Sequence, residues 1–173
     1  MFGKLFKRKL KVSKEEFGQY TLSRIILISA QKCPAIFEEF EIEMDFVDYL
    51  VYLEYLLFLS KKILEQKYSS FEIKIILNAA IDGMIDCMDN VDGSEKGIVK
   101  NKFKIMYSSF ESMSEEICND IGSETGLKNL ANSFLECFGV SKGILENVRV
   151  FTELSCFVIY HTDDVLGKGL KII

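Results

Sequence analysis

The most constraining feature of this sequence is the recurrence of apolar side chains at every third or fourth position along most of its length. An α-helix has 3.6 residues per turn, so this spacing gathers the apolar side chains on one face. The clearest such stripe consists of Ile73, Ile76, Leu77, Ala80, Met84 and Met88. The pattern predicts an all-α protein, a single-domain bundle of five to six amphipathic helices.

Capping signals indicate where several of these helices begin. In a capping box, a small polar residue and an acid three positions later satisfy each other's free backbone N–H groups. The pairs with this spacing are Ser13 and Glu16, Ser69 and Glu72, and Asp92 and Glu95. We therefore expect helices from Ser13, from Ser69 and from the region of Asp92. The first should stop or kink at Pro34, which lacks the N–H that a helix needs.

The segment of about 45–67 is apolar nearly all round, which predicts the central helix of the bundle. Asp48 and Glu54 interrupt its apolar run, whereas a membrane span needs about 20 predominantly apolar residues. We therefore predict a buried helix and not a membrane-spanning one.

Two segments leave alternatives open. Apolar residues continue through 94–121, but a second cap signal at Ser112 and Glu115 allows either one helix or two. Residues 148–160 are rich in β-branched and aromatic side chains, so both a helix and a strand are considered there. Between these two segments, Gly122 and Ser123 open a further helix with an apolar stripe from Leu127 to Phe138. The tail, 167–173, is expected to be loose or docked by its last two isoleucines.

Charge is segregated along the chain. Residues 1–14 contain six basic residues and no acid, whereas residues 15–173 contain 15 basic and 26 acidic residues, a net charge of −11. We therefore divide the chain into a basic, flexible N-terminal arm, 1–14, and a helical domain, 15–173.

The basic arm has the layout of a peripheral membrane contact, with apolar and cationic residues on different sides of a helix. The residues predicted to contact a membrane or another anion are Phe2, Lys4, Leu5, Phe6, Lys7, Arg8, Lys9 and Lys11. The alternatives are contact with nucleic acid or with the acidic body of the same protein. The negative body argues against a broad nucleic-acid surface, so nucleic acid is not the expected partner.

Acidic residues recur on one helical face at Asp82, Asp86 and Asp89, with Asp92 following. This face lies opposite the apolar stripe, so it is predicted to face solvent and to bind a partner protein of opposite charge. Carboxylates so arranged are also suited to a hard cation. The sequence does not fit a calcium-binding loop, so no metal is predicted.

An aromatic set at helical spacing, Tyr49, Tyr52 and Tyr55, is a candidate lining for a ligand pocket. Arg24 is a further candidate, because its guanidinium suits a partly buried anion. The alternatives are a core rim for the tyrosines and a boundary position for Arg24.

The sequence contains no motif that predicts a catalytic site, and no cofactor is predicted. The GxSxG letters at 139–143 follow a helical pattern instead of the strand that a nucleophile elbow requires. His161 is the only histidine, and the five cysteines are at least nineteen residues apart. This spacing argues against disulfides and zinc, and predicts buried thiols in a reducing compartment, the cytoplasm. The Lys- and Ile-rich composition is associated with AT-rich bacterial or phage genomes.

The sequence thus favours a non-enzymatic interaction module, such as a regulator, an adaptor or an immunity-type inhibitor, acting through its acidic face. One alternative is a peripheral membrane protein held at an anionic surface by residues 1–12. Another alternative is a helical enzyme that binds a ligand or a metal. Oligomeric state is left open.

Overall fold

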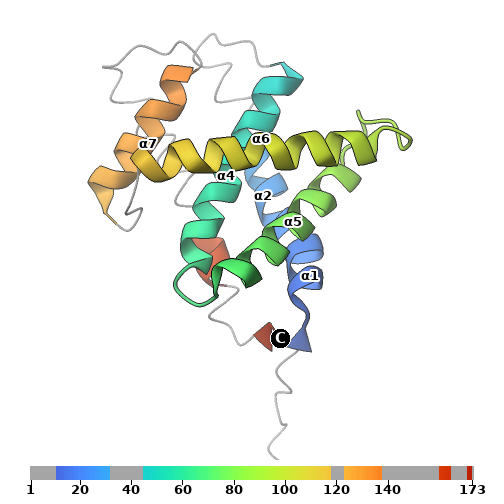
Figure 1. The fold of residues 1–173 in the computed structure, drawn as a ribbon, viewed down its shortest axis with the longest axis horizontal. Coiled ribbons are helices and arrows are strands. Elements are labelled where there is room, and N and C mark those ends of the chain that lie inside the picture. Colours follow the sequence, from blue (N-terminus) through green and yellow to red (C-terminus); the bar gives the residue numbers. More distant parts are fainter. Residues whose placement is uncertain (1–10, 32–44, 118–122, 138–159, 165–170, 173) are drawn as a thin grey trace, which may run out of the picture.

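The structure is a computed structural model that describes residues 11–31, 45–117, 123–137, 160–164 and 171–172 (Figure 1). Its helices are α1 Lys14–Glu16, η1 Phe17–Leu22, α2 Ser23–Ala30, α4 Phe46–Leu64, α5 Ser70–Asp86, α6 Lys96–Ile117 and α7 Glu124–Cys137. Residues 160–164 are helical as well. The predicted all-α helical bundle is confirmed.

The first helical segment begins where the capping box predicted. The Ser13 N–H donates to Glu16 Oε2 at 2.9 Å, and the Glu16 N–H donates to Ser13 Oγ at 3.1 Å. Helices α1, η1 and α2 then follow one another without a break, with η1 in π-helical geometry. Residues of the predicted stripe, Leu22 and Ile26, are buried. Pro34 lies outside the described residues.

Glycine permits an unusually close approach between η1 and α5. A Cβ at Gly18 would lie 2.2 Å from the carbonyl oxygen of Ile76, and a Cβ at Gly83 would lie 2.3 Å from that of Gln19. Both distances are far shorter than any tolerated contact, so backbone meets backbone at two points. This packing brings the N-terminal segment onto α5, as Figure 1 shows for α1 and α2.

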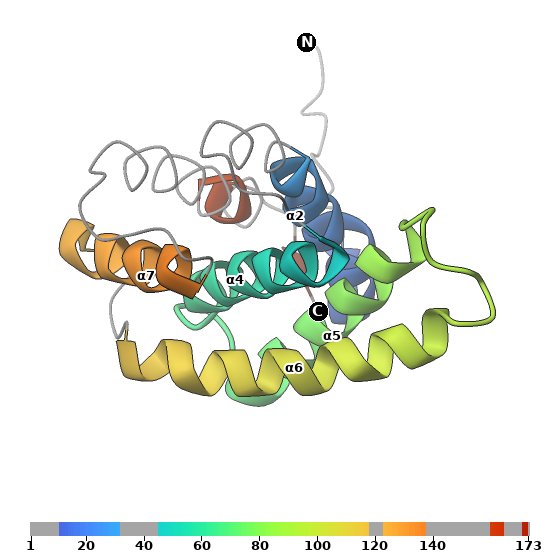
Figure 2. The ribbon, with the colours of Figure 1, turned by 90° about the horizontal axis from the view of Figure 1, so that it is seen from above.

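Helix α4 is the centre of the bundle, as its uniform apolar character predicted. Asp45 caps it, and the Asp48 N–H donates to Asp45 Oδ1 at 2.8 Å. Every residue from Tyr52 to Ser60 is buried. Figure 2 shows α4 in the middle, with α6 on one side, α2 on the other and α7 beside it. None of the helices in the described part of the chain is both long and apolar enough to cross a membrane.

Helix α6 is one unbroken helix of 22 residues, which settles the alternative left open for 94–121. Its inner face buries Phe103 and Tyr107, with Phe110 partly buried. Met113, which belongs to the predicted apolar seam, is exposed.

In α7, the predicted face is confirmed for Leu130, Ala131 and Phe134, which are buried. Residues 148–159, considered as helix or strand, lie outside the described residues.

The two ends of the described chain meet. Strand β1 Lys11–Val12 pairs in parallel with β2 Lys171–Ile172, with Val12 opposite Ile172. Ile172 is only 9% exposed and belongs to the hydrophobic core, so the tail is docked by an isoleucine, one of the two expected outcomes.

Candidate functional site

The predicted acidic face is largely paired with lysines of α6. Asp82 Oδ1 lies 2.7 Å from Lys104 Nζ, and Asp86 Oδ1 lies 2.7 Å from Lys100 Nζ. Lys96 Nζ also donates to the Asp86 carbonyl oxygen at 2.7 Å. These lysines recur every four residues in α6, as the two acids do in α5, so the chain supplies much of the opposite charge itself.

The remaining members of the acidic set lie in the turn after α5. Asp89 and Asp92 are exposed. The Ser94 hydroxyl and backbone N–H both donate to Asp92, which lowers the pKa of that carboxyl. Asp92 thus shapes the turn before α6 and does not form the expected capping box with Glu95. Among the described residues, no group of three or more potential ligands is placed to hold a metal ion.

The aromatic set divides between core and boundary. Tyr52 and Tyr55 are fully buried, and the Tyr55 ring lies 4.6 Å from that of Phe134 in α7. Tyr49 is half-buried, whereas Arg24 is exposed on α2. The structure therefore gives Tyr52 and Tyr55 the environment of a core and does not bury Arg24 beside them.

The N-terminal candidates lie mostly outside the described residues. Phe2 to Lys9 are not described, and Lys11 is exposed in β1. The predicted membrane contact therefore stays a prediction.

Of the other residues considered for chemistry, the structure describes His161 and Cys87. His161 is half-buried, and its ring meets that of Tyr160 edge-on at 5.4 Å. Ser141 lies outside the described residues. Cys87 is exposed and not buried as predicted; it is the C-terminal cap residue of α5.

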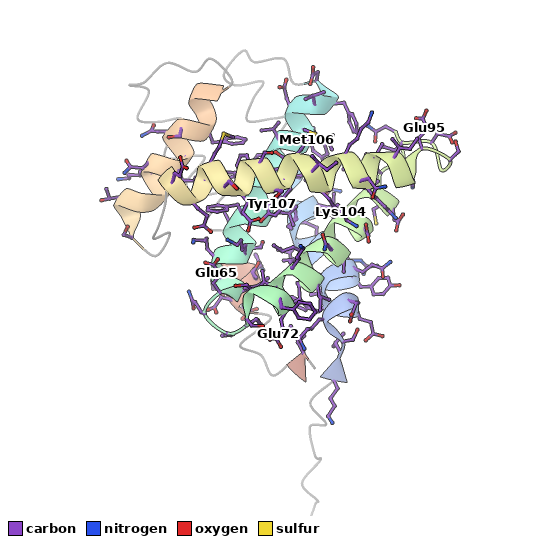
Figure 3. All side chains as sticks on the ribbon, in the orientation of Figure 1. Glu65, Glu72, Glu95, Lys104, Met106 and Tyr107 are labelled. Atoms are coloured by element: carbon purple, nitrogen blue, oxygen red, sulfur yellow. The ribbon has the colours of Figure 1, made fainter. Side chains whose placement is uncertain are left out.

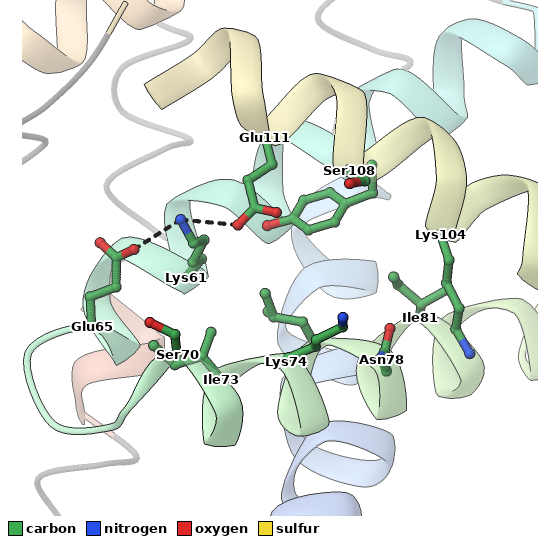
Figure 4. A pocket seen from close by; sticks show the side chains of 12 residues that line it. Lys61, Glu65, Ser70, Ile73, Lys74, Asn78, Ile81, Lys104, Ser108 and Glu111 are labelled. Atoms are coloured by element: carbon green, nitrogen blue, oxygen red, sulfur yellow. Dashed lines mark ion pairs between the residues drawn. The ribbon is translucent and has the colours of Figure 1, made fainter. Parts of the chain in front are cut away.

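Sequence reasoning missed a groove of about 330 Å³ that opens between α5 and α6 (Figure 4). Helix α5 contributes Ser70, Ile73, Lys74, Leu77, Asn78 and Ile81. Helix α6 contributes Lys104, Tyr107, Ser108 and Glu111, and the end of α4 contributes Lys61 and Glu65. We call this the α5–α6 groove. Its volume lies within the range of small ligand-binding sites.

The inner end of the α5–α6 groove is closed by an ion-pair network. Lys61 Nζ lies 2.9 Å from Glu65 Oε1 and 3.0 Å from Glu111 Oε1, and it also pairs with Glu115. Lys62 pairs with Glu65 at 3.0 Å and with Glu115 at 2.7 Å. Both lysine side chains are mostly buried. Figure 4 shows Lys61 between Glu65 and Glu111.

The ion pairs shift the pKa values of Lys61, Lys62 and Glu115. Burial acts to lower the pKa of Lys61 and Lys62, but hydrogen bonds to Glu115 and Glu65 outweigh it, and both pKa values are raised. Burial acts to raise the pKa of Glu115, and its two lysine partners outweigh this and lower it. Each group is therefore held in its charged form, which makes Lys61 a poor proton acceptor.

Two buried polar groups between α4 and α6 have no hydrogen-bond partner among the described residues, Tyr107 Oη and Glu54 Oε1. Tyr107 lines the groove, and in Figure 3 it projects from α6 on the same side as Lys104. Burial, followed by the carboxylates of Glu111 and Glu115, raises the pKa of Tyr107 well above its usual value. Glu54 is 3% exposed, and burial raises its pKa to about 7.

Helix α5 carries an exposed cation in the α5–α6 groove and an exposed aromatic ring one turn earlier. Lys74 is exposed and forms no ion pair within the described part of the chain. Phe71, one turn earlier in α5, is 74% exposed. Ile73, Leu77 and Ile81 line the groove on the same helix. This arrangement is suited to holding an apolar group next to an anion.

Serine and tyrosine hydroxyl groups are among the groups that line the α5–α6 groove. The residues that the structure places around it include no histidine and no cysteine. Its hydroxyl groups, on Ser70, Ser108 and Tyr107, have no neutral imidazole or other free base beside them there. Nucleophilic catalysis requires such a base to activate the hydroxyl.

No family model, no curated protein and no solved structure matches this chain.

Proposed function

We propose that this protein is a non-enzymatic interaction module that binds a short segment of a partner protein in the α5–α6 groove. The observation that carries the proposal is the exposed Lys74, which lines the groove with Ile73 and Leu77 and forms no ion pair among the described residues, with the exposed Phe71 one turn earlier in α5. A Phe that is 74% exposed beside a groove is typical of a surface that another protein covers.

The charges indicate what the segment contains. Lys61 and Lys104 are occupied by Glu65, Glu111 and Asp82, which leaves Lys74 as the groove cation available to a ligand among the residues described. A carboxylate on the segment would pair with Lys74, and an apolar side chain would contact Ile73 and Leu77.

The acidic face predicted from the sequence remains a competing proposal in a reduced form. Lysines of α6 occupy Asp82 and Asp86, so Asp89 and Asp92 are the members of the set that are both exposed and outside the helix interface. A basic partner would bind there, at the turn between α5 and α6, and not in the groove. Membrane attachment through residues 1–12 also stays a proposal.

A selection of random peptides displayed on phage, with the full chain as target, tests the groove. We expect the selected peptides to combine an apolar residue with Asp or Glu. Lys74→Glu should weaken their binding at least tenfold, because it replaces an attraction by a repulsion. Phe71→Ala should weaken it about tenfold, as expected for an exposed aromatic anchor.

Lys11→Glu is the matched control, because Lys11 is exposed on β1 and does not line the groove. It makes the same charge change and should leave peptide binding intact. Changing the peptide carboxylate to the amide should weaken binding to the wild-type chain much more than to the Lys74→Ala variant. The opposite outcome is the selection of basic peptides whose binding is lost in the Asp89→Lys variant and unchanged in the Lys74→Glu variant. It would contradict binding in the groove and favour the acidic face.

A further inference from the structure

The outward face of α6 carries apolar side chains that the rest of the molecule leaves uncovered. In Figure 2, α6 lies along one edge of the bundle, with α2, α4 and α7 on its inner side. Ile98, Ile105 and Met113 are exposed, and Ile105 is 71% exposed. Their spacing of seven and eight residues places them within one sector of the helix. Uncovered apolar stripes of this kind mark interaction surfaces.

Two charged residues accompany this stripe, and neither has an ion pair among the described residues. Lys102 and Glu116 are both exposed on the same sector of α6. They contrast with the charged residues on the inner side of the helix, such as Lys104 and Glu111, which pair with α5 and α4. On the outward face of α6, the apolar side chains are thus exposed, and Lys102 and Glu116 have no ion pair among the described residues.

The order of these residues is symmetric about Ser109. Lys102 and Glu116 lie seven positions before and after it, and Ile105 and Met113 lie four positions before and after it. An antiparallel copy of α6, related by a twofold axis at Ser109, would bring Lys102 opposite Glu116 twice. The same register brings Ile105 opposite Met113 twice. The helix face is therefore complementary to itself in charge and in apolar contact.

We propose that α6 pairs with α6 of a second copy of this chain, antiparallel and centred at Ser109. Ser109 and Ser112 lie in the middle of the stripe and are exposed, and their small side chains let two helices approach closely. Because α6 has 22 residues, it is about 33 Å long. A single helix face of that length buries less than the roughly 800 Å² per partner of a standard interface, so the dimer is weak.

This pairing leaves the α5–α6 groove accessible. The groove residues Lys104, Tyr107 and Glu111 lie on the side of α6 that faces α5 and α4. Their sector lies roughly 160° from the stripe, given the 100° advance per residue. A dimer would therefore present two grooves, and the test of self-association is independent of peptide binding.

Sedimentation equilibrium over a range of about 1 µM to 1 mM measures the self-association. For the wild-type chain we expect a monomer–dimer equilibrium with a Kd of roughly 10–100 µM, in keeping with a small interface. Lys102→Glu and Glu116→Lys should each weaken it about tenfold, because every dimer contains the pair twice. Ile105→Glu should abolish it.

Charge exchange separates this register from other modes of association. The double variant Lys102→Glu/Glu116→Lys should regain the wild-type Kd, since both pairs are restored with reversed sign. An equimolar mixture of the two single variants should form a heterodimer with that affinity. Circular dichroism checks that all variants stay folded, and Lys11→Glu serves as the unaffected charge control. A wild-type chain that stays monomeric at 1 mM, or a dimer indifferent to these changes, would overturn the proposal.

Discussion

At the scale of single residues, Glu54 is the most unusual group in the fold. It lies in the centre of α4, it is 3% exposed, and its Oε1 has no hydrogen-bond partner among the described residues. Burial disfavours the carboxylate, and the pKa is raised from 4.5 to about 7. Between these two values the folded chain holds a proton that the unfolded chain releases. Stability therefore falls as pH rises from about 4.5 to about 7.

The loss of stability with rising pH leads to a prediction for the Glu54→Gln variant. The variant removes the charge but keeps the shape, so it should be more stable than wild type at pH 8, by about 3 kcal/mol at most. At pH 5 the two proteins should be nearly equal, because the buried carboxyl is protonated in the folded wild-type chain. Urea denaturation at the two pH values measures the difference. Glu15→Gln, at an exposed site, is the control. An equal effect at both pH values would contradict the assigned state of Glu54.

At the scale of elements, the fold depends on two glycines where η1 meets α5. Most contacts between helices here are made by side chains, which have room to adjust. At Gly18 and Gly83 the neighbouring atom is a backbone carbonyl oxygen, which cannot move without moving its helix. The π-helical geometry of η1 belongs to the same contact region.

We expect Gly18→Ala to destabilise the protein by about 2–3 kcal/mol, because the added methyl would force η1 away from α5. Gly97→Ala is the matched control. A Cβ at Gly97 meets nothing within 4 Å, and alanine favours the helix by up to about 1 kcal/mol. Chemical denaturation of both variants checks the contrast. If Gly18→Ala were as harmless as Gly97→Ala, the close approach of the two helices would be wrong.

At the scale of the whole molecule, the fold closes on itself through its two ends. The short β1–β2 pair joins Lys11 and Val12 to Lys171 and Ile172, and Ile172 reaches the hydrophobic core. This contact spans nearly the full sequence, so it forms only when the rest of the bundle is in place.

Ile172→Ala should therefore lower the free energy of unfolding by about 2 kcal/mol, as expected for truncating a buried isoleucine. Ile28→Ala is the control, because Ile28 is exposed on α2. Its loss should change stability by less than about 0.5 kcal/mol. Thermal and urea unfolding of the two variants measure these effects. Equal, small losses would mean that the C-terminal residues contribute nothing to the core.

The sequence by itself determined the local features of this protein. The caps at Ser13 and Ser69, the stripe of α5 and the burial of α4 were all readable, because each depends on residues within a few positions of one another. The structure alone decided which surfaces meet. In the tertiary structure Asp82 pairs with Lys104, Cys87 and Met113 are exposed, and a groove lies between α5 and α6. Periodicity states which face of a helix is apolar, but the neighbour of each face depends on how all the helices pack together.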